Sequence, residues 1–513
     1  MKSRSHQSMP EELEDASEDS EAGDAEHSPE PAVDESNPWV TMSGGVRYFC
    51  LGALAIYTAV CVVGSLLYAS ENPATPLLAL SDLIYLGVFA VPLLVFDRER
   101  DGWFHPMVFA TVYAMVRQLP RRIDTFIHGL SAHTVLSGNE EHLTRLVAYE
   151  NFLNALALAC TFFGFYLIRS TWLPDIPLQP PRRLWPVIWG SAIISFVALI
   201  LLVGLSGDFT QHILNLSLNQ SAVVRDKEID GTGQLVLPAQ WFAWSLVMFL
   251  AYRPRVLRNP AFWAVSLVAL AMVYLAAGKR SILIAPVGTA AVVWMLTNRR
   301  VPIVRMVLLL VGVFVTFSVL LLVRAAISGG AKNLDEVGAR VSENLETAFT
   351  SQLDEVGTRG GSYSSVYPIL EQVPSDSPLL WGETYLTILT RPIPRVLWPS
   401  KPRGTDFRAG VTFFNAVWGV PPGPVAEAYW NFHIPGVIGV FFLWGVFNRW
   451  IYNVFLAYHE HGLVVFFYAF TLLVLTPTEN TITGWMMTLI PTVLFGLATG
   501  ILGRSAASDH HGV

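Results

Sequence analysis

Leu184–Leu205, LWPVIWGSAIISFVALILLVGL, is a run of 22 residues without a charged side chain. An α-helix needs about 20 mostly apolar residues to cross the ~30 Å hydrocarbon core of a bilayer. Arg182 and Arg183 directly precede the run, as cations do at the cytoplasmic end of a span. This stretch therefore predicts a membrane-spanning helix, and much of the chain repeats its pattern.

Composition places the whole chain in the same class. Of its 513 residues, 52% are hydrophobic and 14% are charged, and the mean hydropathy is +0.45. Soluble domains carry about 25% charged residues. We therefore predict an all-α polytopic membrane protein with about 12 transmembrane helices, near residues 48–69, 77–96, 103–119, 146–168, 184–205, 235–252, 261–277, 281–297, 306–326, 434–455, 463–478 and 484–503.

The first residues have a different composition. Residues 1–38 contain twelve acidic side chains against Lys2 and Arg4, and they lack an apolar run. Such a segment cannot bury enough apolar surface to fold, so residues 1–44 are expected to form a disordered acidic tail without a cleavable signal. Cys50, Cys61 and Cys160 lie within apolar segments at no zinc-binding spacing, which predicts neither a metal nor a disulfide.

Arginines in alternate short loops predict the orientation. The positive-inside rule places these loops in the cytoplasm together with both chain ends. The chain then divides into the tail (1–44), nine spans (45–326), a large extracytoplasmic loop (327–433) and three further spans (434–513). The arginines of the inside loops are Arg98, Arg100, Arg169, Arg182, Arg183, Arg253, Arg255, Arg258, Arg299, Arg300 and Arg305, with Arg449 as a weaker signal.

The large loop is expected to have two halves. Apolar residues at helical spacing predict an amphipathic helix over Asn333–Tyr367. The second half is interrupted by prolines and is expected to be irregular or re-entrant. Irregular backbone at membrane depth must be buried in protein or line a wet cavity.

Within that half, Arg391–Arg403 (RPIPRVLWPSKPR) places cations on the outer side, where topology disfavours them. Proline favours extended backbone, so Arg391 and Arg395 are expected to share one face. Their guanidinium groups suit bidentate phosphate contacts, and Trp398 suits the membrane interface. This points to an anionic ligand, although anionic lipid head groups remain an alternative.

A second polar group precedes the span at 434. Glu427, Tyr429 and Asn431 alternate with apolar residues as in a strand, while Glu427 and Asn431 are also spaced as one face of a helix. A partly desolvated Glu427 is a candidate general base for a sugar hydroxyl. The alternative is that its carboxylate only anchors the start of a helix.

Three other outer segments carry candidate phosphate contacts. Gly278-Lys279-Arg280-Ser281 opens a predicted helix, where backbone amides and Arg280 would form an anion site unless it is only a hairpin turn. Arg225 and Arg324 lie in or beside outer loops, although snorkelling also explains Arg324. The chain has no Walker A sequence and no dinucleotide-binding glycine motif, so any sugar donor is expected to be lipid-linked.

Five motifs of the chain form a recurring set: Gly278-Lys-Arg280, Gly382-Glu-Thr-Tyr385, Ile393-Pro-Arg395-Val-Leu-Trp398-Pro-Ser-Lys401-Pro402, Ala426-Glu427-Ala-Tyr429-Trp-Asn431-Phe and Gly436. With these motifs the chain resembles the Wzy-type oligosaccharide repeat-unit polymerases, which are related to O-antigen polymerases and ligases. The similarity covers roughly residues 45–505, and the chain departs from the family after Asn431, where Phe432-His433 replaces the usual Phe-Gly.

The resemblance implies a type-C glycosyltransferase-like fold in a bacterial inner membrane. It also implies transfer of a glycan from one undecaprenyl-pyrophosphate carrier to the terminal sugar of another, on the outer face, without metal or other cofactor. Its partners would be the lipid-linked donor and acceptor, membrane lipids and a candidate chain-length regulator, and not nucleic acid. By this resemblance, Arg280, Arg391 and Arg395 would bind pyrophosphate, with support from Arg225 and Arg324. Glu427 would activate the acceptor, and Tyr429 and Asn431 would position the sugar. The second carrier would be clamped by Lys401, Arg403 and Arg408.

Two rival functions remain open at this point. An O-antigen-ligase-like enzyme would move a finished glycan to a lipid or protein acceptor. A transporter of lipid-linked glycans predicts charged side chains at the middle of the spans. Asp82 is the main acidic residue inside a predicted span, and most charged residues lie in outer loops, which disfavours transport.

Overall fold

The computed structural model describes a helical chain. Every element among the described residues is a helix, and none of them is a β-strand, which confirms the predicted all-α class for this part of the chain. The predicted acidic tail lies outside the described residues except for Gly44. The described residues are 44–68, 72–95, 102–112, 139–168, 173, 184–205, 233–236, 238–277, 281–299, 363–390, 393, 397–398, 400–415, 420 and 422–474.

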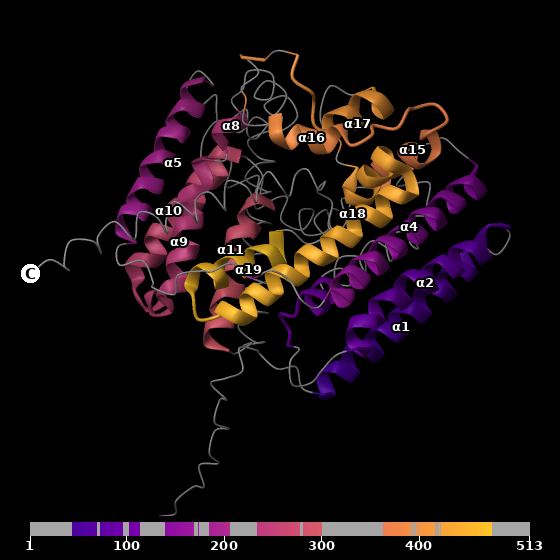
Figure 1. Ribbon diagram of the computed structural model, residues 1–513, viewed down its shortest axis with the longest axis horizontal. Coiled ribbons are helices and arrows are strands. Elements are labelled where there is room, and N and C mark those ends of the chain that lie inside the picture. Colours follow the sequence, from indigo (N-terminus) through magenta and orange to yellow (C-terminus); the bar gives the residue numbers. More distant parts are fainter. Residues whose placement is uncertain are drawn as a thin grey trace, which may run out of the picture. The chain divides into compact units, whose positions relative to one another are not determined.

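Helices α1 (Gly44–Tyr68), α2 (Thr75–Leu94) and α4 (Glu140–Leu167) pack side by side, with α2 between the other two (Figure 1). A polar cluster joins them in their buried interior. Asp82 of α2 is fully buried and accepts hydrogen bonds from Ser65 Oγ at 2.8 Å and from Asn151 Nδ2 at 2.9 Å. Because a polar group in hydrocarbon must find its partner within the protein, these bonds explain how α2 accommodates an acid.

The long helix α18 (Gly423–Tyr458) crosses α4 at very close range. A Cβ atom on Gly164 would lie 2.2 Å from the carbonyl oxygen of Phe442, and one on Gly445 would lie 2.1 Å from that of Thr161. Only glycine allows the two backbones to approach this closely. Small residues at helix crossings are typical of membrane bundles, where packing rather than the hydrophobic effect holds helices together.

A second group of helices completes the described part of the bundle. Its core is apolar and aromatic; for example, Trp244 contacts Phe470 edge to face with ring centroids 5.1 Å apart. The elements of this group are α5 (Trp185–Leu205), α8 (Gly233–Val236), η2 (Pro238–Gln240), α9 (Trp241–Tyr252), η3 (Pro254–Arg258), α10 (Pro260–Ala277), α11 (Ser281–Asn298) and α19 (Gly462–Val474).

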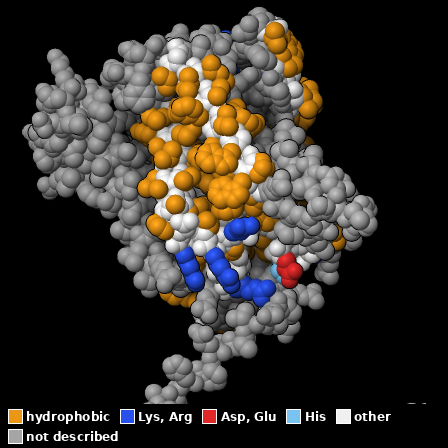
Figure 2. Space-filling view, turned by 90° about the vertical axis from the view of Figure 1, so that its left-hand side faces the viewer, with side chains coloured by type: hydrophobic (Ala, Val, Ile, Leu, Met, Phe, Trp, Pro, Cys, Tyr) orange, Lys and Arg blue, Asp and Glu red, His pale blue; other side chains and the backbone are white. Residues whose placement is uncertain are grey.

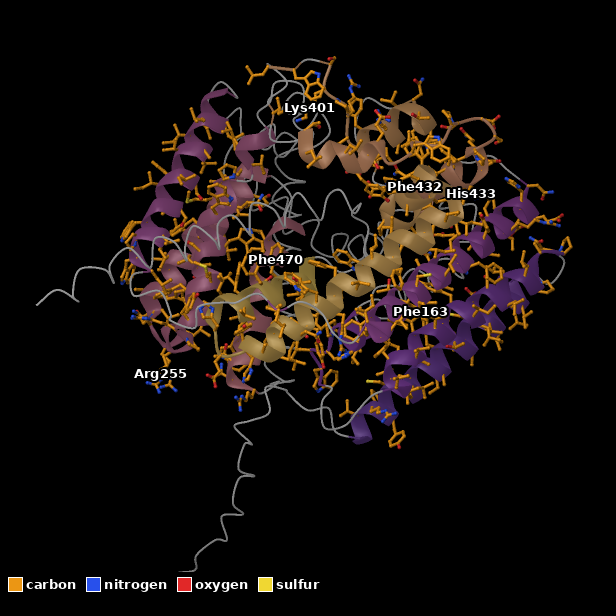
Figure 3. All side chains as sticks on the ribbon, viewed as in Figure 1. Phe163, Arg255, Lys401, Phe432, His433 and Phe470 are labelled. Atoms are coloured by element: carbon orange, nitrogen blue, oxygen red, sulfur yellow. The ribbon has the colours of Figure 1, made fainter. Side chains whose placement is uncertain are left out.

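The turn between α18 and α19 lies beside the turn between α9 and α10. The rings of Tyr252 and His461 are 5.7 Å apart, and a Cβ atom on Gly462 would touch the Tyr252 ring at 2.7 Å. The part of α18 after residue 433 is about 37 Å long at 1.5 Å per residue. The start of α18 and the arginine turn that contains Arg255 are therefore at opposite ends of the bundle, as the positions of Arg255 and Lys401 in Figure 3 indicate.

Five described helices are long and apolar enough to cross a membrane: α1, α2, α4, α5 and α18. Two shorter apolar helices, Pro260–Ala276 and Gly462–Leu473, coincide with further predicted spans. Figure 2 shows a wide apolar face on one side of the molecule. Helices α5 and α10 expose large apolar side chains, including Trp189 and Leu267. The spans predicted near 306–326 and 484–503 lie outside the described residues.

Three short helices cover the end of the bundle at which α18 begins: α15 (Tyr363–Gln372), α16 (Glu383–Thr390) and α17 (Thr405–Phe414). The helix predicted over Asn333–Tyr367 lies mostly outside the described residues, and α15 contains only its last five. His142 of α4 and Glu371 of α15 are 2.8 Å apart, so an exposed ion pair connects α15 to the bundle whenever the histidine is protonated.

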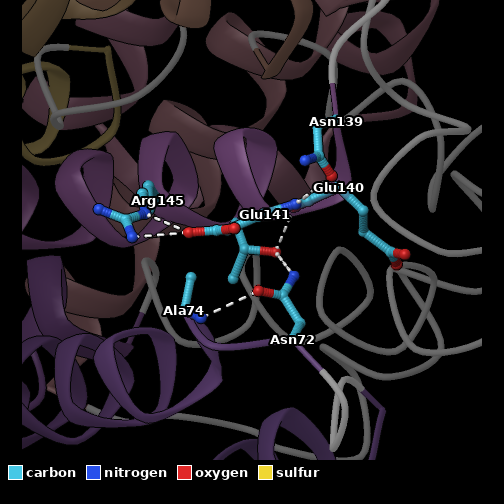
Figure 4. Close-up of polar contacts among 7 residues, drawn as sticks. Asn72, Ala74, Asn139, Glu140, Glu141 and Arg145 are labelled. Carbon is cyan, nitrogen blue, oxygen red and sulfur yellow. Dashed lines mark hydrogen bonds and ion pairs between the residues drawn. The ribbon is translucent and has the colours of Figure 1, made fainter.

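Local hydrogen bonds fix the start of α4 beneath this cover. The Asn139 side chain caps the helix by accepting from the Glu141 amide at 3.3 Å, and Glu141 pairs with Arg145 one turn later at 2.6 Å (Figure 4). Asn72, just before α2, donates to Thr144 at 3.0 Å. The beginnings of α2 and α4 are therefore joined at the end of the bundle that carries α15.

Candidate active site

A kink divides α18 into a short and a long segment. Phe432 (φ −140°, ψ 17°) and His433 (φ 58°, ψ −149°) are not helical, and Pro435 follows them. A Cβ atom on Gly436 would lie 2.3 Å from the Ala428 carbonyl oxygen, so the bend requires glycine at this position. The residues before the kink are helical rather than extended, which decides between the two geometries that the sequence left open.

Asn431 ends the short segment and connects it to the chain before α16. It is fully buried, and its Oδ1 accepts from the Gly382 amide at 3.0 Å. Its Nδ2 donates to Thr384 Oγ1 at 2.7 Å and to the Glu427 carbonyl at 2.8 Å. The amide of Trp381 also donates to the Asn431 carbonyl at 3.0 Å. The start of α16 is thus held against α18.

Glu427 lies one helical turn before Asn431 and is also fully buried. Its Oε1 accepts a hydrogen bond of 2.6 Å from Thr405 Oγ1. Thr405 is the first residue of α17, and the N-terminal end of a helix carries a partial positive charge that favours an anion. The carboxylate therefore bonds to the start of α17 and does not occupy the first turn of its own helix.

Tyr385 of α16 brings a phenol into the electrostatic field of this carboxylate. Its hydroxyl oxygen is buried and has no hydrogen-bond partner among the described residues. Burial raises the pKa of Tyr385, and the negative charge of Glu427 raises this pKa further. Buried polar atoms nearly always have a partner, so a buried phenol without one is a candidate contact for a ligand hydroxyl.

Sequence reasoning assigned no role to Thr384, Tyr385 or Thr405. The motif Gly382-Glu-Thr-Tyr385 entered only as part of the family resemblance, yet it supplies groups that contact Asn431 and act on Glu427. Polar residues in a short helix of a mostly apolar protein were the available signal. Their proximity to Glu427 is a property of the fold.

Two cations of the expected carrier clamp have partners within the protein. Lys401 is buried and its Nζ donates to the Ile393 carbonyl at 2.8 Å, which closes the loop that carries Trp398. Arg408 makes a two-pronged ion pair with Glu383, with one bond of 2.8 Å. Arg403 is exposed, with its guanidinium 4.1 Å from the centre of the Phe407 ring.

Tyr429 and Trp398 occupy different surroundings. Tyr429 is buried, and its hydroxyl is 2.7 Å from Nε2 of His433 and 3.4 Å from the hydroxyl of Tyr149. Trp398 is exposed and its Nε1 donates to Ser400 at 3.0 Å. Tyr429 thus joins the kink to α4, while Trp398 lies at the surface.

The expected pyrophosphate-binding residues Arg225, Arg280, Arg324, Arg391 and Arg395 lie outside the described residues, and their roles stay predictions. In the part of the chain that the structure describes, His, Cys, Asp and Glu side chains form no group of three or more that could hold a metal ion.

Comparisons with known proteins add no assignment at this point. No family model matches the chain, and no curated protein and no solved structure is similar to it at a significant level.

Proposed function

We propose that this chain polymerises oligosaccharide repeat units carried on undecaprenyl pyrophosphate, at the outer face of a bacterial plasma membrane. The observation that carries the proposal is the buried Glu427 carboxylate, held by Thr405, with the buried Tyr385 phenol in its field. These groups suit activation of a sugar hydroxyl. The resemblance to the Wzy-type polymerases supplies the rest of the reaction.

In the proposed transfer, Glu427 accepts the proton of the acceptor sugar hydroxyl as the oxygen attacks the anomeric carbon of the donor. The bond between that carbon and the pyrophosphate oxygen breaks, and the pyrophosphate leaves with the electron pair. Tyr385 orients the acceptor hydroxyl, and Asn431 positions Glu427 by fixing its helix. Arg280, Arg391 and Arg395, with Arg225 and Arg324, neutralise the leaving group.

The orientation rests on the two ends of the bundle. Arg253, Arg255 and Arg258 are exposed at the turn between α9 and α10, and such a basic turn favours the cytoplasm. Glu427 belongs to the opposite end, which is then outside. With twelve spans, both chain ends are cytoplasmic, and a donor reached from outside must be lipid-linked.

Arg403 remains the most accessible cation of the expected clamp for the second carrier. Lys401 and Arg408 are engaged by Ile393 and Glu383, so they support the shape of the loop in this proposal. Arg403 lies on the Phe407 ring with its guanidinium exposed, which suits contact with a carrier phosphate.

The test is polymer synthesis by Glu427→Gln, which keeps the size of the side chain and removes the base. Membrane vesicles with equal amounts of each variant receive lipid-linked repeat units, and products are separated by length. We expect single units only, whereas the matched Glu371→Gln variant, which removes an exposed acid outside the site, keeps the full ladder. Long polymer from Glu427→Gln would refute the assignment.

Analysis of the lipid-linked glycans in cells that carry the same variant separates the rival functions. Loss of a ligase would leave full-length polymer on its carrier, and loss of a transporter would leave lipid-linked units on the inner face. Either pattern in Glu427→Gln cells would exclude a polymerase.

A further inference from the structure

A second candidate site lies at the end of the bundle opposite Glu427. The turn between α9 and α10 exposes three arginines within six residues: Arg253, Arg255 and Arg258. A row of basic side chains borders the apolar face in Figure 2. A cationic turn that adjoins an exposed apolar surface combines the two chemistries of an anionic lipid.

An apolar cavity of about 350 Å³ opens beside this turn, between α9, α10 and α11. Leu257, which lies between two of the arginines in sequence, is one of its lining residues, so the cavity reaches the turn. Its lining along α11 runs from Met295 to Pro286, about 13 Å at 1.5 Å per residue. Among the described residues that line it, Ser266 is the only one with a hydroxyl.

We propose that the cavity and the arginine turn together bind one anionic, two-chain phospholipid. One acyl chain occupies the cavity, and the head-group phosphate lies on Arg253, Arg255 and Arg258. The planar guanidinium group matches phosphate geometry, and small-molecule sites are typically concave and apolar with a few placed polar groups. The choice of this lipid over the polyprenyl carrier rests on the proposed function, whereas the test below measures lipid binding and not polymer synthesis.

Position selects a phospholipid over the polyprenyl carrier. The carrier must present its pyrophosphate at the Glu427 end of α18, whereas the cavity adjoins the arginine turn beside the other end of α18. A lipid bound at the arginine turn would therefore come from the membrane leaflet on the arginine side of the bundle. Basic groups near a membrane surface each favour anionic over neutral lipid by about fivefold.

The test measures lipid retained by the purified full-length chain. The protein is equilibrated in detergent with equal amounts of phosphatidylglycerol and phosphatidylcholine, and bound lipid is counted by native mass spectrometry. Arg253→Gln, Arg255→Gln and Arg258→Gln are combined to remove the head-group contacts. Ala290→Phe fills the cavity, and Arg145→Gln, an exposed arginine of α4 at the other end, is the matched control.

The unmodified chain and Arg145→Gln are expected to retain phosphatidylglycerol in preference to phosphatidylcholine. The combined arginine variant should lose that preference, up to about 100-fold at about fivefold per arginine. Ala290→Phe should retain less of both lipids. An unchanged preference in the combined variant would overturn the proposal. So would equal retention of both lipids by the unmodified chain, or displacement of phosphatidylglycerol by equimolar undecaprenyl phosphate.

Discussion

Replacing Asn431 with alanine should loosen the contact between the start of α16 and α18 while the backbone bond from Trp381 remains. The side chain makes three hydrogen bonds of 2.7 to 3.0 Å, to Gly382, Thr384 and the Glu427 carbonyl. A hydrogen bond contributes about 1 kcal/mol net, so their removal should cost about 3 kcal/mol locally. We expect the Gly382 amide, which loses its acceptor, to exchange its hydrogen at least about fivefold faster, since about 1 kcal/mol corresponds to this factor.

Hydrogen exchange with single-residue fragmentation in detergent measures this effect. The Trp381 amide is an internal reference, because its acceptor is the backbone carbonyl of residue 431, which alanine retains. Asn448→Ala is the matched control: among the residues that the structure describes, that buried side chain bonds only to a carbonyl of its own helix, at 2.9 Å. Unchanged exchange at Gly382, or an equal increase in the Asn448 variant, would refute the role given to Asn431.

Two further predictions concern packing and titration. Gly445→Val should lower the thermal unfolding midpoint, because the new Cβ atom would lie 2.1 Å from the Thr161 carbonyl and would push α4 and α18 apart. Gly439→Val is the control: a Cβ atom at that position meets open space, so the midpoint should stay nearly unchanged. Burial and Glu427 raise the pKa of Tyr385 above its ordinary value of 10.0, so the stability that this residue contributes is present below pH 10 and is lost above it. In an absorbance titration, the folded chain and the Tyr385→Phe variant should therefore form equal amounts of tyrosinate near pH 10. Less tyrosinate in the variant would show that Tyr385 ionises there and would contradict the raised pKa.

The helices could largely be predicted from the sequence, because a span needs only a long apolar run and its length is set by the bilayer. The predicted span over 184–205 corresponds to α5, and that over 281–297 to α11. The segment at 424–433 was ambiguous since polar residues there fit both a strand and a helix. The structure shows a helix there, in which the Asn431 side chain donates to the Glu427 carbonyl one turn earlier.

The candidate site was predicted only in part. Glu427 and Asn431 stood out because they are polar and directly precede a span. Lys401 and Arg408 contact Ile393 and Glu383 within the fold, and their expected binding of a carrier stays a prediction. The sequence shows that a cation is present, but the carbonyl or carboxylate that it contacts depends on the tertiary structure.

By itself, the sequence determined that this chain is helical and membrane-embedded, since local hydropathy is enough to specify a span. Only the tertiary structure decided which distant residues contact the site. Thr405 bonds to Glu427, 22 residues later in the chain, and Thr384 bonds to Asn431, 47 residues later. The physical reason is that contacts between distant segments depend on how loops close and helices pack. The kink at Phe432 and His433, and the close approach of glycine to the neighbouring backbone, fix that packing.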